Sequence, residues 1–501
     1  MISLKRNIIA NLAGSGWVAL MSFTFIPFYI HFMGIESYGL VGFFMSLQAV
    51  LFILDLGLTA TVSRELARLS VNAEPADRMR ALVRTLELVY WGISLLICLG
   101  TILLSQWLAG EWLQSESLPK EKVAEAIMLM GFVIAARMPF GFYCGGLMGL
   151  QHQVLASVVK ASTETVRNGG VVLVLWLLSP DITAFFLWQV GISVVATCVM
   201  GRCLWRSMPE SLRSPRFDSG ILRKLYRFAA GMSGIALVSI LLMQMDKIIL
   251  SKMLSLETFG YYTVASVVGM SLFFLATPIV SAYAPKLTQL ASADECQQEL
   301  IGRYHQGCQL MAVVIFPVAV TIALFSSEIL LLWTQDANVV DSAHLSLSLL
   351  VTGTALNSIM NIPYSLQVAY GWTRLAFVLN LLLLMLQFPL LIIMTQYYGV
   401  VGAASVWLIL NIVYVLVGVH MMHMHIITEE KWKWCLYDVL LPLCATVVVA
   451  VIGRYLVSET MSVTLIFISL VMITMLSFLA ALFAAPLARG YLFLVLKRGT
   501  L

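Results

Sequence analysis

Three charged side chains lie in one apolar stretch of the sequence. Lys160, Glu164 and Arg167 occupy positions i, i+4 and i+7, a spacing that places them on one face of a helix. Cations on such a face could hold a phosphate or an acidic sugar, while Glu164 could set the local field or carry a proton. The alternative is a ladder of ion pairs that locks neighbouring helices together.

Two further charges interrupt apolar stretches in the first half of the chain. Arg137 lies two residues before Pro139, and a proline inside a helix frees polar backbone groups that a cavity or a neighbour must satisfy. Arg137 therefore either lines a cavity or forms a buried pair with Asp55 or Glu164. The carboxylate of Asp55 either exchanges a proton, caps a neighbouring helix or pairs with an arginine.

The second half of the chain carries mostly neutral polar groups. Asp246 and Lys247 lie near the end of an apolar stretch, where they either act directly or simply reach water. Amides can bond sugar hydroxyls, but between membrane helices they are also ordinary packing contacts. Both interpretations apply to four amides at helix-compatible spacings, Asn357, Asn361, Asn380 and Gln387.

Three histidines, His420, His423 and His425, are interspersed with three methionines in the segment 420–425. A soft metal could use such ligands, but their position at the end of an apolar stretch favours anchoring at a membrane interface. The sequence therefore predicts no metal site and no cofactor.

The composition defines the surroundings of these charges. Of 501 residues, 60% are hydrophobic and 11% are charged, whereas soluble domains carry about 25% charged residues. The apolar stretches reach the roughly 20 residues that a helix needs to cross a bilayer. We therefore predict an all-α integral membrane protein, in which a charge at mid-bilayer costs at least about 2.5 kcal/mol and marks a candidate site.

Apolar stretches between polar breaks predict about 14 transmembrane helices. Most Lys and Arg lie on the side of both chain ends and of the even-numbered connections, which predicts cytoplasmic N- and C-termini. The net charge of +4 therefore indicates orientation and no nucleic-acid partner. The approximate helix ranges are 8–33, 40–63, 82–108, 123–149, 154–178, 182–205, 226–250, 259–283, 308–333, 344–370, 374–396, 400–424, 436–456 and 463–485.

The sequence repeats itself at a nearly constant offset. The segment 33–40 matches 254–261, with Gly39 over Gly260, and the segment from Pro139 to Gly149 matches that from Pro363 to Gly371. Copies of six helices point the same way and define parallel repeats. We predict a six-helix lobe at 1–205, a basic cytoplasmic linker at 206–225, a second lobe at 226–430, and two additional helices with a tail at 431–501.

The residues resemble the bacterial polysaccharide-repeat flippases of the Wzx type, in the multidrug/oligosaccharidyl-lipid/polysaccharide exporter superfamily. The resemblance is carried by Asn11, Pro27, the segment Gly34-Ile-Glu-Ser-Tyr-Gly39, and Asp55-Leu-Gly57 followed by Arg64, and the layout of six, six and two helices extends it over the chain.

This resemblance implies two six-helix lobes around a polar cavity in the bacterial inner membrane. The implied activity is alternating-access translocation of undecaprenyl-diphosphate-linked oligosaccharide to the periplasmic leaflet, for O-antigen, capsule or exopolysaccharide. A polysaccharide polymerase and a chain-length regulator are implied candidate partners.

Other functions remain open on the same fold. One is export of a peptidoglycan precursor or of drugs, although the buried cations favour an anionic cargo. A membrane-embedded polymerase would be expected to need a constellation of acid/base or metal-binding groups in a substantial extramembrane loop, and the short connection 109–122 contains no such constellation. The sequence also contains no Walker-type phosphate loop, so active transport would need an ion gradient such as protons or sodium, the substrate gradient or another subunit.

Overall fold

The computed structural model describes residues 4–71, 76–211, 217–293, 297–457 and 461–490. The residues 212–216 of the predicted linker and 491–501 of the predicted tail lie outside this description. Two compact units, Met1–Gly260 and Tyr261–Leu501, are distinguished. The lobe, linker and tail boundaries given above stay a prediction.

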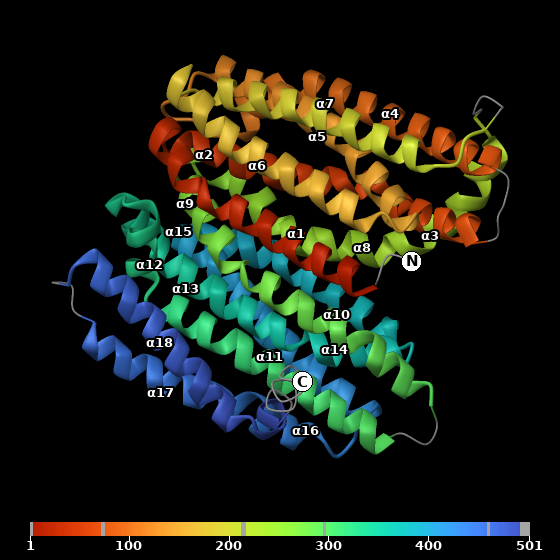
Figure 1. Ribbon diagram of the computed structural model, residues 1–501. Coiled ribbons are helices and arrows are strands. Elements are labelled where there is room, and N and C mark those ends of the chain that lie inside the picture. Colours follow the sequence, from red (N-terminus) through yellow and green to blue (C-terminus); the bar gives the residue numbers. More distant parts are fainter. Residues whose placement is uncertain (1–3, 72–75, 212–216, 294–296, 458–460, 491–501) are drawn as a thin grey trace. The chain divides into compact units, whose positions relative to one another are not determined.

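Helices make up the first unit (Figure 1). They are α1 (Leu4–Thr24), α2 (Ile26–Leu51), the 3-10 turn η1 (Phe52–Asp55), α3 (Leu58–Val71), α4 (Ala76–Trp107), the π-helical turn η2 (Leu108–Trp112), α5 (Lys120–Gly149), α6 (Gln153–Leu177), α7 (Ile182–Ser207), α8 (Ser219–Met253) and the first residues of α9 (Leu256–Gly269).

The second unit is also built from helices. They are the remainder of α9, α10 (Leu272–Ala291), α11 (Gln297–Leu324), α12 (Ser326–Thr334), α13 (Ala337–Ile359), α14 (Asn361–Ala369), α15 (Thr373–His425), α16 (Lys431–Lys433), the π-helical turn η3 (Trp434–Leu440), α17 (Leu441–Leu456) and α18 (Val463–Ala484).

The predicted all-α membrane class is confirmed. In the described part of the chain, ten helical stretches are long and apolar enough to cross a bilayer, and such helices satisfy their own backbone hydrogen bonds, as lipid requires. The helix α15 contains a non-helical residue, Gly399, at the predicted border between two spans. The total of 14 stays a prediction.

Several predicted spans are not continuous helices. The predicted helix 40–63 ends at Leu51, and α3 begins only after Leu56 and Gly57, which have φ of 48° and 72°. The predicted span 344–370 consists of α13 and α14, with a break at Met360. There Pro363 lies in the first turn of α14, where its missing N–H is tolerated, whereas in one long helix it would have left a carbonyl unpaired.

The first repeated motif forms a reciprocal contact. A Cβ on Gly39 would collide with the carbonyl oxygen of Leu256, and a Cβ on Gly260 with that of Ile35. Ile35 and Leu256 differ by the same 221 positions as the two glycines, so each motif places its glycine against the other's backbone. Glycine is needed at both positions because the chains approach without room for a side chain.

The second repeated motif also has a structural counterpart. Equivalent residues of its two copies lie 220 positions apart in the sequence. The amide of His152 donates to Leu147 (2.9 Å) after Gln151 at φ 62°, and the amide of Trp372 donates to Gln367 (2.9 Å) after Gly371 at φ 70°. Both are helix ends with a left-handed residue after the last turn. The sequence match of Gly149 with Gly371 was therefore two residues out of register.

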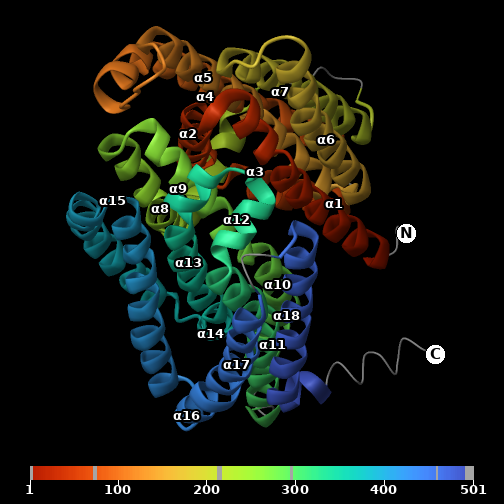
Figure 2. The same cartoon turned by 90° about the vertical axis from the view of Figure 1, so that its left-hand side faces the viewer.

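Figure 2 shows α17 and α18 beside α11 in the second unit. A buried polar cluster joins them at one end: the ring of His305 on α11 contacts Asp438 of η3 (Nδ1 to Oδ2, 2.5 Å) and Glu430 (Nε2 to Oε2, 3.1 Å). Gln309 donates to Asp438 and accepts from the amide of Leu487. These contacts attach the two C-terminal helices to the rest of the unit.

Candidate functional site

Two cavities in the first unit meet at the same charged side chains. Their volumes are about 490 Å³ and 430 Å³, and both are lined by Arg137, Glu164 and Arg167. Lys160 lines the second cavity, so every member of the charged stripe on α6 faces a cavity. Lining groups from α2, α5, α6 and α7 bring together parts of the sequence that are far apart.

Arg137 reaches this site from the middle of α5. It donates to Gln48 of α2 (Nη1 to Oε1, 2.7 Å) and to Gln189 of α7 (Nη2 to Oε1, 3.0 Å), and its guanidinium lies 5.4 Å from the ring centre of Phe44. Neither predicted carboxylate, Asp55 or Glu164, is among its hydrogen-bond partners in the described part of the chain. Neutral amides orient Arg137 without cancelling its charge.

The proline next to Arg137 shapes the helix locally. Because Pro139 has no N–H, the carbonyl of Ala135 loses its donor within α5. Ser94 of α4 donates to that carbonyl instead (2.7 Å), and Thr197 of α7 donates to the carbonyl of Ala136 (2.6 Å). Hydroxyl groups of two neighbouring helices therefore hold α5 at the two residues that precede Arg137.

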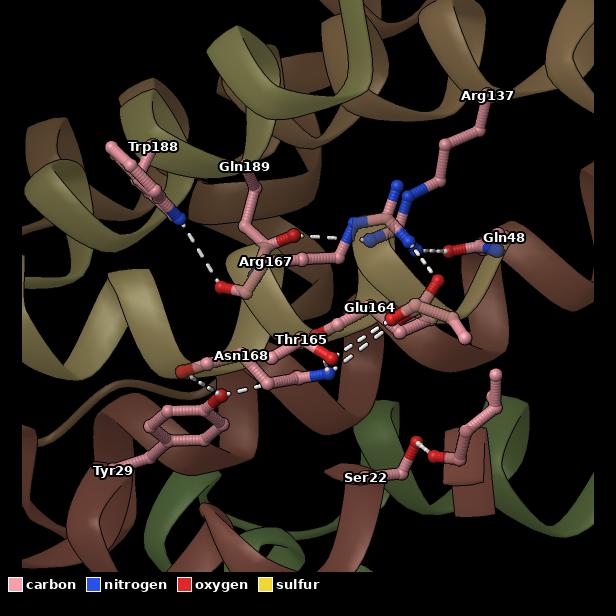
Figure 3. A network of polar contacts seen from close by, with 12 residues as sticks. Ser22, Tyr29, Gln48, Arg137, Glu164, Thr165, Arg167, Asn168, Trp188 and Gln189 are labelled. Carbon is pink, nitrogen blue, oxygen red and sulfur yellow. Dashed lines mark hydrogen bonds and ion pairs between the residues drawn. The ribbon is translucent and has the colours of Figure 1, made fainter. Parts of the chain in front are cut away.

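Arg167 is arranged differently, as Figure 3 shows. It forms an ion pair with Glu164 one turn earlier on α6, and the side chains of Arg167 and Glu164 are 7% and 19% exposed. Asn168 donates to the Glu164 backbone carbonyl (2.9 Å), and Tyr29 of α2 donates to the Asn168 amide oxygen (3.1 Å). This arrangement realises part of the predicted ion ladder, although the same groups also line both cavities.

Unused donors remain on both arginines. The Nε atoms of Arg137 and Arg167 are buried without a hydrogen-bond partner among the described residues. A buried donor without an acceptor costs about 1–3 kcal/mol, more when charged, so the two guanidinium groups are suited to an additional anion. With Glu164 ionised, no carboxylate of the described residues pairs with the second arginine.

Asp55 lies apart from the arginines. It accepts hydrogen bonds from Tyr90 of α4 and from the hydroxyl of Thr59 (2.6 Å), and more weakly from the amide of Thr59 (3.5 Å). Its contacts therefore satisfy the first turn of α3, which is the capping alternative. A role of Asp55 in coupling stays a prediction.

The predicted residues of the second half make local contacts. Asp246 contacts Lys247 (3.5 Å). Asn357 donates to Asn411 of α15 (2.8 Å), and Asn361 donates to the backbone of Ser358 (3.0 Å) at the break between α13 and α14.

Gln387 is buried on α15, and its Oε1 has no partner among the described residues. Asn380 lies two turns earlier on that helix. A sugar-binding role for these amides remains a prediction.

Sequence reasoning missed Gln48 and Gln189. Each is an amide inside an apolar stretch, and that was the available signal, because polar side chains inside membrane helices commonly bond across helices. It also missed Glu87, a buried carboxylate that accepts from Arg84 (2.8 Å), Tyr143 (2.5 Å) and Trp205 (3.2 Å).

Known structures share this fold. The lipid II flippase MurJ in its inward closed conformation has a TM-score of 0.67 at 14% identity, covering 95% of this chain and 97% of MurJ. An inward-facing multidrug resistance MATE family transporter of the MOP superfamily has a TM-score of 0.64 at 16% identity, covering 85% and 96%. Fold and cavity together define the class: an all-α membrane protein with the fold of lipid and drug transporters.

The sequence comparisons narrow this class. The "Putative O-antigen transporter" of Shigella flexneri is 21% identical over 408 residues, which are 81% of this chain and 94% of that protein. Residues 4–291, more than half of the chain, match the family described as polysaccharide biosynthesis protein. The chain belongs to this family, and the predicted resemblance is confirmed. The relatives named here are transporters and flippases, and none is named as an enzyme.

Proposed function

We propose that this protein is a flippase that moves undecaprenyl-diphosphate-linked oligosaccharide from the cytoplasmic to the periplasmic leaflet. The observation that carries the proposal is the pair of arginines on the two cavities, of which only Arg167 is paired with a carboxylate among the described residues. A diphosphate supplies the acceptor oxygens that guanidinium groups bind best. The family and the O-antigen transporter relative support a polysaccharide precursor as the cargo.

The surroundings of the arginines suit an amphipathic cargo. Most of the first cavity's lining is apolar, from Ile26, Val41, Met45 and Met243. Transport proceeds in this proposal by alternating access without covalent chemistry, and an ion gradient supplies any energy needed. The proposal places the protein in the inner membrane, beside the polymerase and chain-length regulator that use the flipped product.

A peptidoglycan precursor is the second candidate cargo. It shares the diphosphate that the arginines would bind, and the fold similarity to the lipid II flippase extends over most of the chain. Cationic drugs fit less well, because an uncompensated arginine would repel them.

The test is flipping of a fluorescent undecaprenyl-diphosphate oligosaccharide in proteoliposomes. We expect wild-type protein to flip it and Arg137→Ala to lose at least about tenfold in rate, because one charged contact contributes about 1.5–3 kcal/mol. Arg374→Ala removes an exposed arginine outside both cavities and serves as the matched control. Preference for lipid II over the oligosaccharide would favour the second candidate, and no flipping of either lipid would refute the proposal.

A further inference from the structure

The ion pair between Glu164 and Arg167 lies at an unusual place for a purely structural contact. Both side chains line both cavities, and Arg137, which has only neutral partners in the described part of the chain, lines them too. Figure 3 shows Arg137, Arg167 and Glu164 extending into the same part of the site, where all three line both cavities. The carboxylate therefore occupies the place where an incoming anion would meet Arg167.

Carboxylate and phosphate oxygens compete for the same donors of a guanidinium group. Glu164 accepts from Nη1 of Arg167, while the buried Nε of that arginine and the Nε of Arg137 have no partner among the described residues. One carboxylate thus leaves donors unused on both arginines. A phosphate has more oxygens and could engage both groups at once.

The structure also provides a place for the carboxylate after displacement. The amide nitrogen of Asn168 already lies 3.4 Å from Oε2 of Glu164. A hydrogen bond from Tyr29 fixes the orientation of Asn168. A small rotation of Glu164 away from Arg167 would therefore keep one hydrogen-bond donor.

We propose that Glu164 is an internal substitute for the substrate phosphate: it holds Arg167 while the site is empty, and a phosphate of the cargo displaces it. This inference rests on the proposed function, because it assigns the regulation of that site. The charged and titratable groups that line the cavities with Glu164 are Arg137 and Cys144 of α5, Lys160 and Arg167 of α6, and Tyr29 and Tyr38 of α2. Return of Glu164 to Arg167 would help to release the anion on the far side of the membrane.

A group that competes for a binding site lowers the affinity of the site for its ligand and hastens the release of that ligand. Glu164→Gln removes the competing charge but keeps the shape, so we expect inorganic pyrophosphate to bind at least about fivefold more tightly, which is the lower end of usual coupling between sites. Multiple-turnover flipping should become slower, because the anion leaves late. A merely structural carboxylate would instead leave pyrophosphate affinity unchanged or weaken it.

The experiment measures pyrophosphate binding by calorimetry on the full chain in nanodiscs, together with flipping in proteoliposomes. Glu65→Gln is the matched control, because Glu65 forms an ion pair with Arg68 at the same i, i+3 spacing (2.8 Å) outside both cavities. Glu164→Ala removes the acceptor altogether and should tighten binding as well. In that variant, added acetate should restore competition with pyrophosphate.

The outcomes separate the two proposals. Tighter binding by both Glu164 variants and not by Glu65→Gln supports the substitute role. Unchanged or weaker binding by both Glu164 variants, including no binding by any variant, overturns it, and the proposed function stands if wild-type protein still flips the lipid. Tighter pyrophosphate binding by the Glu164 variants, without any flipping by wild-type protein, would support the displacement of Glu164 by an anion and would refute the proposed lipid cargo.

Discussion

Arg137 and Arg167 show how one residue type takes two roles in one site. Arg167 has a carboxylate partner one turn away on the same helix, so its charge is largely compensated. Arg137 is held by amide oxygens from two other helices, which fix its direction and leave its charge available. We regard Gln48 and Gln189 as positioning residues for Arg137.

Replacing Gln189 with Leu tests this role. A hydrogen bond to a charged group contributes about 1.5–3 kcal/mol, so we expect flipping of the diphosphate-linked lipid to slow by about tenfold, with an increase in KM. Gln367→Leu is the control, because it removes a buried amide that lies outside both cavities and is not a candidate substrate contact. Equal losses in the two variants, measured in proteoliposomes, would mean that the amides serve folding rather than Arg137.

At the scale of elements, the close backbone approach at Gly39 and Gly260 can be tested by adding a methyl group at either glycine. Gly39→Ala or Gly260→Ala would force a Cβ into a backbone carbonyl, and overpacking costs typically about 1–3 kcal/mol. We expect a lower melting temperature and a lower yield of folded protein for each variant.

Gly92→Ala is the matched control for these substitutions. Gly92 lies inside α4, and a methyl group added there would meet no neighbouring group within 4 Å. Ala is also the better helix former, so this variant should be as stable as the wild type or slightly more stable. Wild-type stability of both Gly39→Ala and Gly260→Ala would contradict the close approach.

The attachment of the C-terminal helices predicts a pH dependence. Burial favours a higher pKa for Glu430, but hydrogen bonds from Lys433 and His305 outweigh it and hold the pKa of Glu430 below its ordinary value. The resulting stabilisation is complete above the pKa of an unfolded glutamate and is lost as the pH falls through the lowered folded-state pKa.

We therefore expect Glu430→Gln to destabilise the protein at neutral pH, by about 1.5–3 kcal/mol for a hydrogen bond to a charged group, and to converge with the wild type in acid. Thermal unfolding in nanodiscs over a pH series measures this difference. Glu429→Gln, at the exposed neighbouring position, should match the wild type throughout. A difference between Glu430→Gln and wild type that grows in acid would show that the sign is wrong.

At the scale of the whole molecule, the distribution of Lys and Arg predicts which ends of the helices face the cytoplasm. In a cysteine-free background, Lys120→Cys should react with an impermeant thiol reagent added from the periplasm, and Glu210→Cys should not. Both positions are exposed, so accessibility of the side chain does not decide the result. The opposite pattern would reverse the predicted orientation.

Much of the fold follows from local features of the sequence. The length of the apolar stretches predicts where helices lie, because a membrane helix forms its backbone hydrogen bonds within one segment of the chain. The helix breaks were harder to predict: the turn at Leu56 and Gly57 interrupts an apolar stretch without a proline. The hydrogen bonds that Asp55 accepts beside it come from Thr59 and Tyr90, and Tyr90 is distant in sequence.

By itself, the sequence determined the membrane class, most helix positions, the charged face of α6 and the first repeated motif, since hydropathy, helical spacing and short motifs are local properties. Only the tertiary structure decided which groups meet Arg137, because Gln48 and Gln189 lie 89 and 52 positions away. It also decided that Glu164 both pairs with Arg167 and lines the cavities. Such pairings depend on how helices distant in sequence pack, and no local pattern encodes that packing.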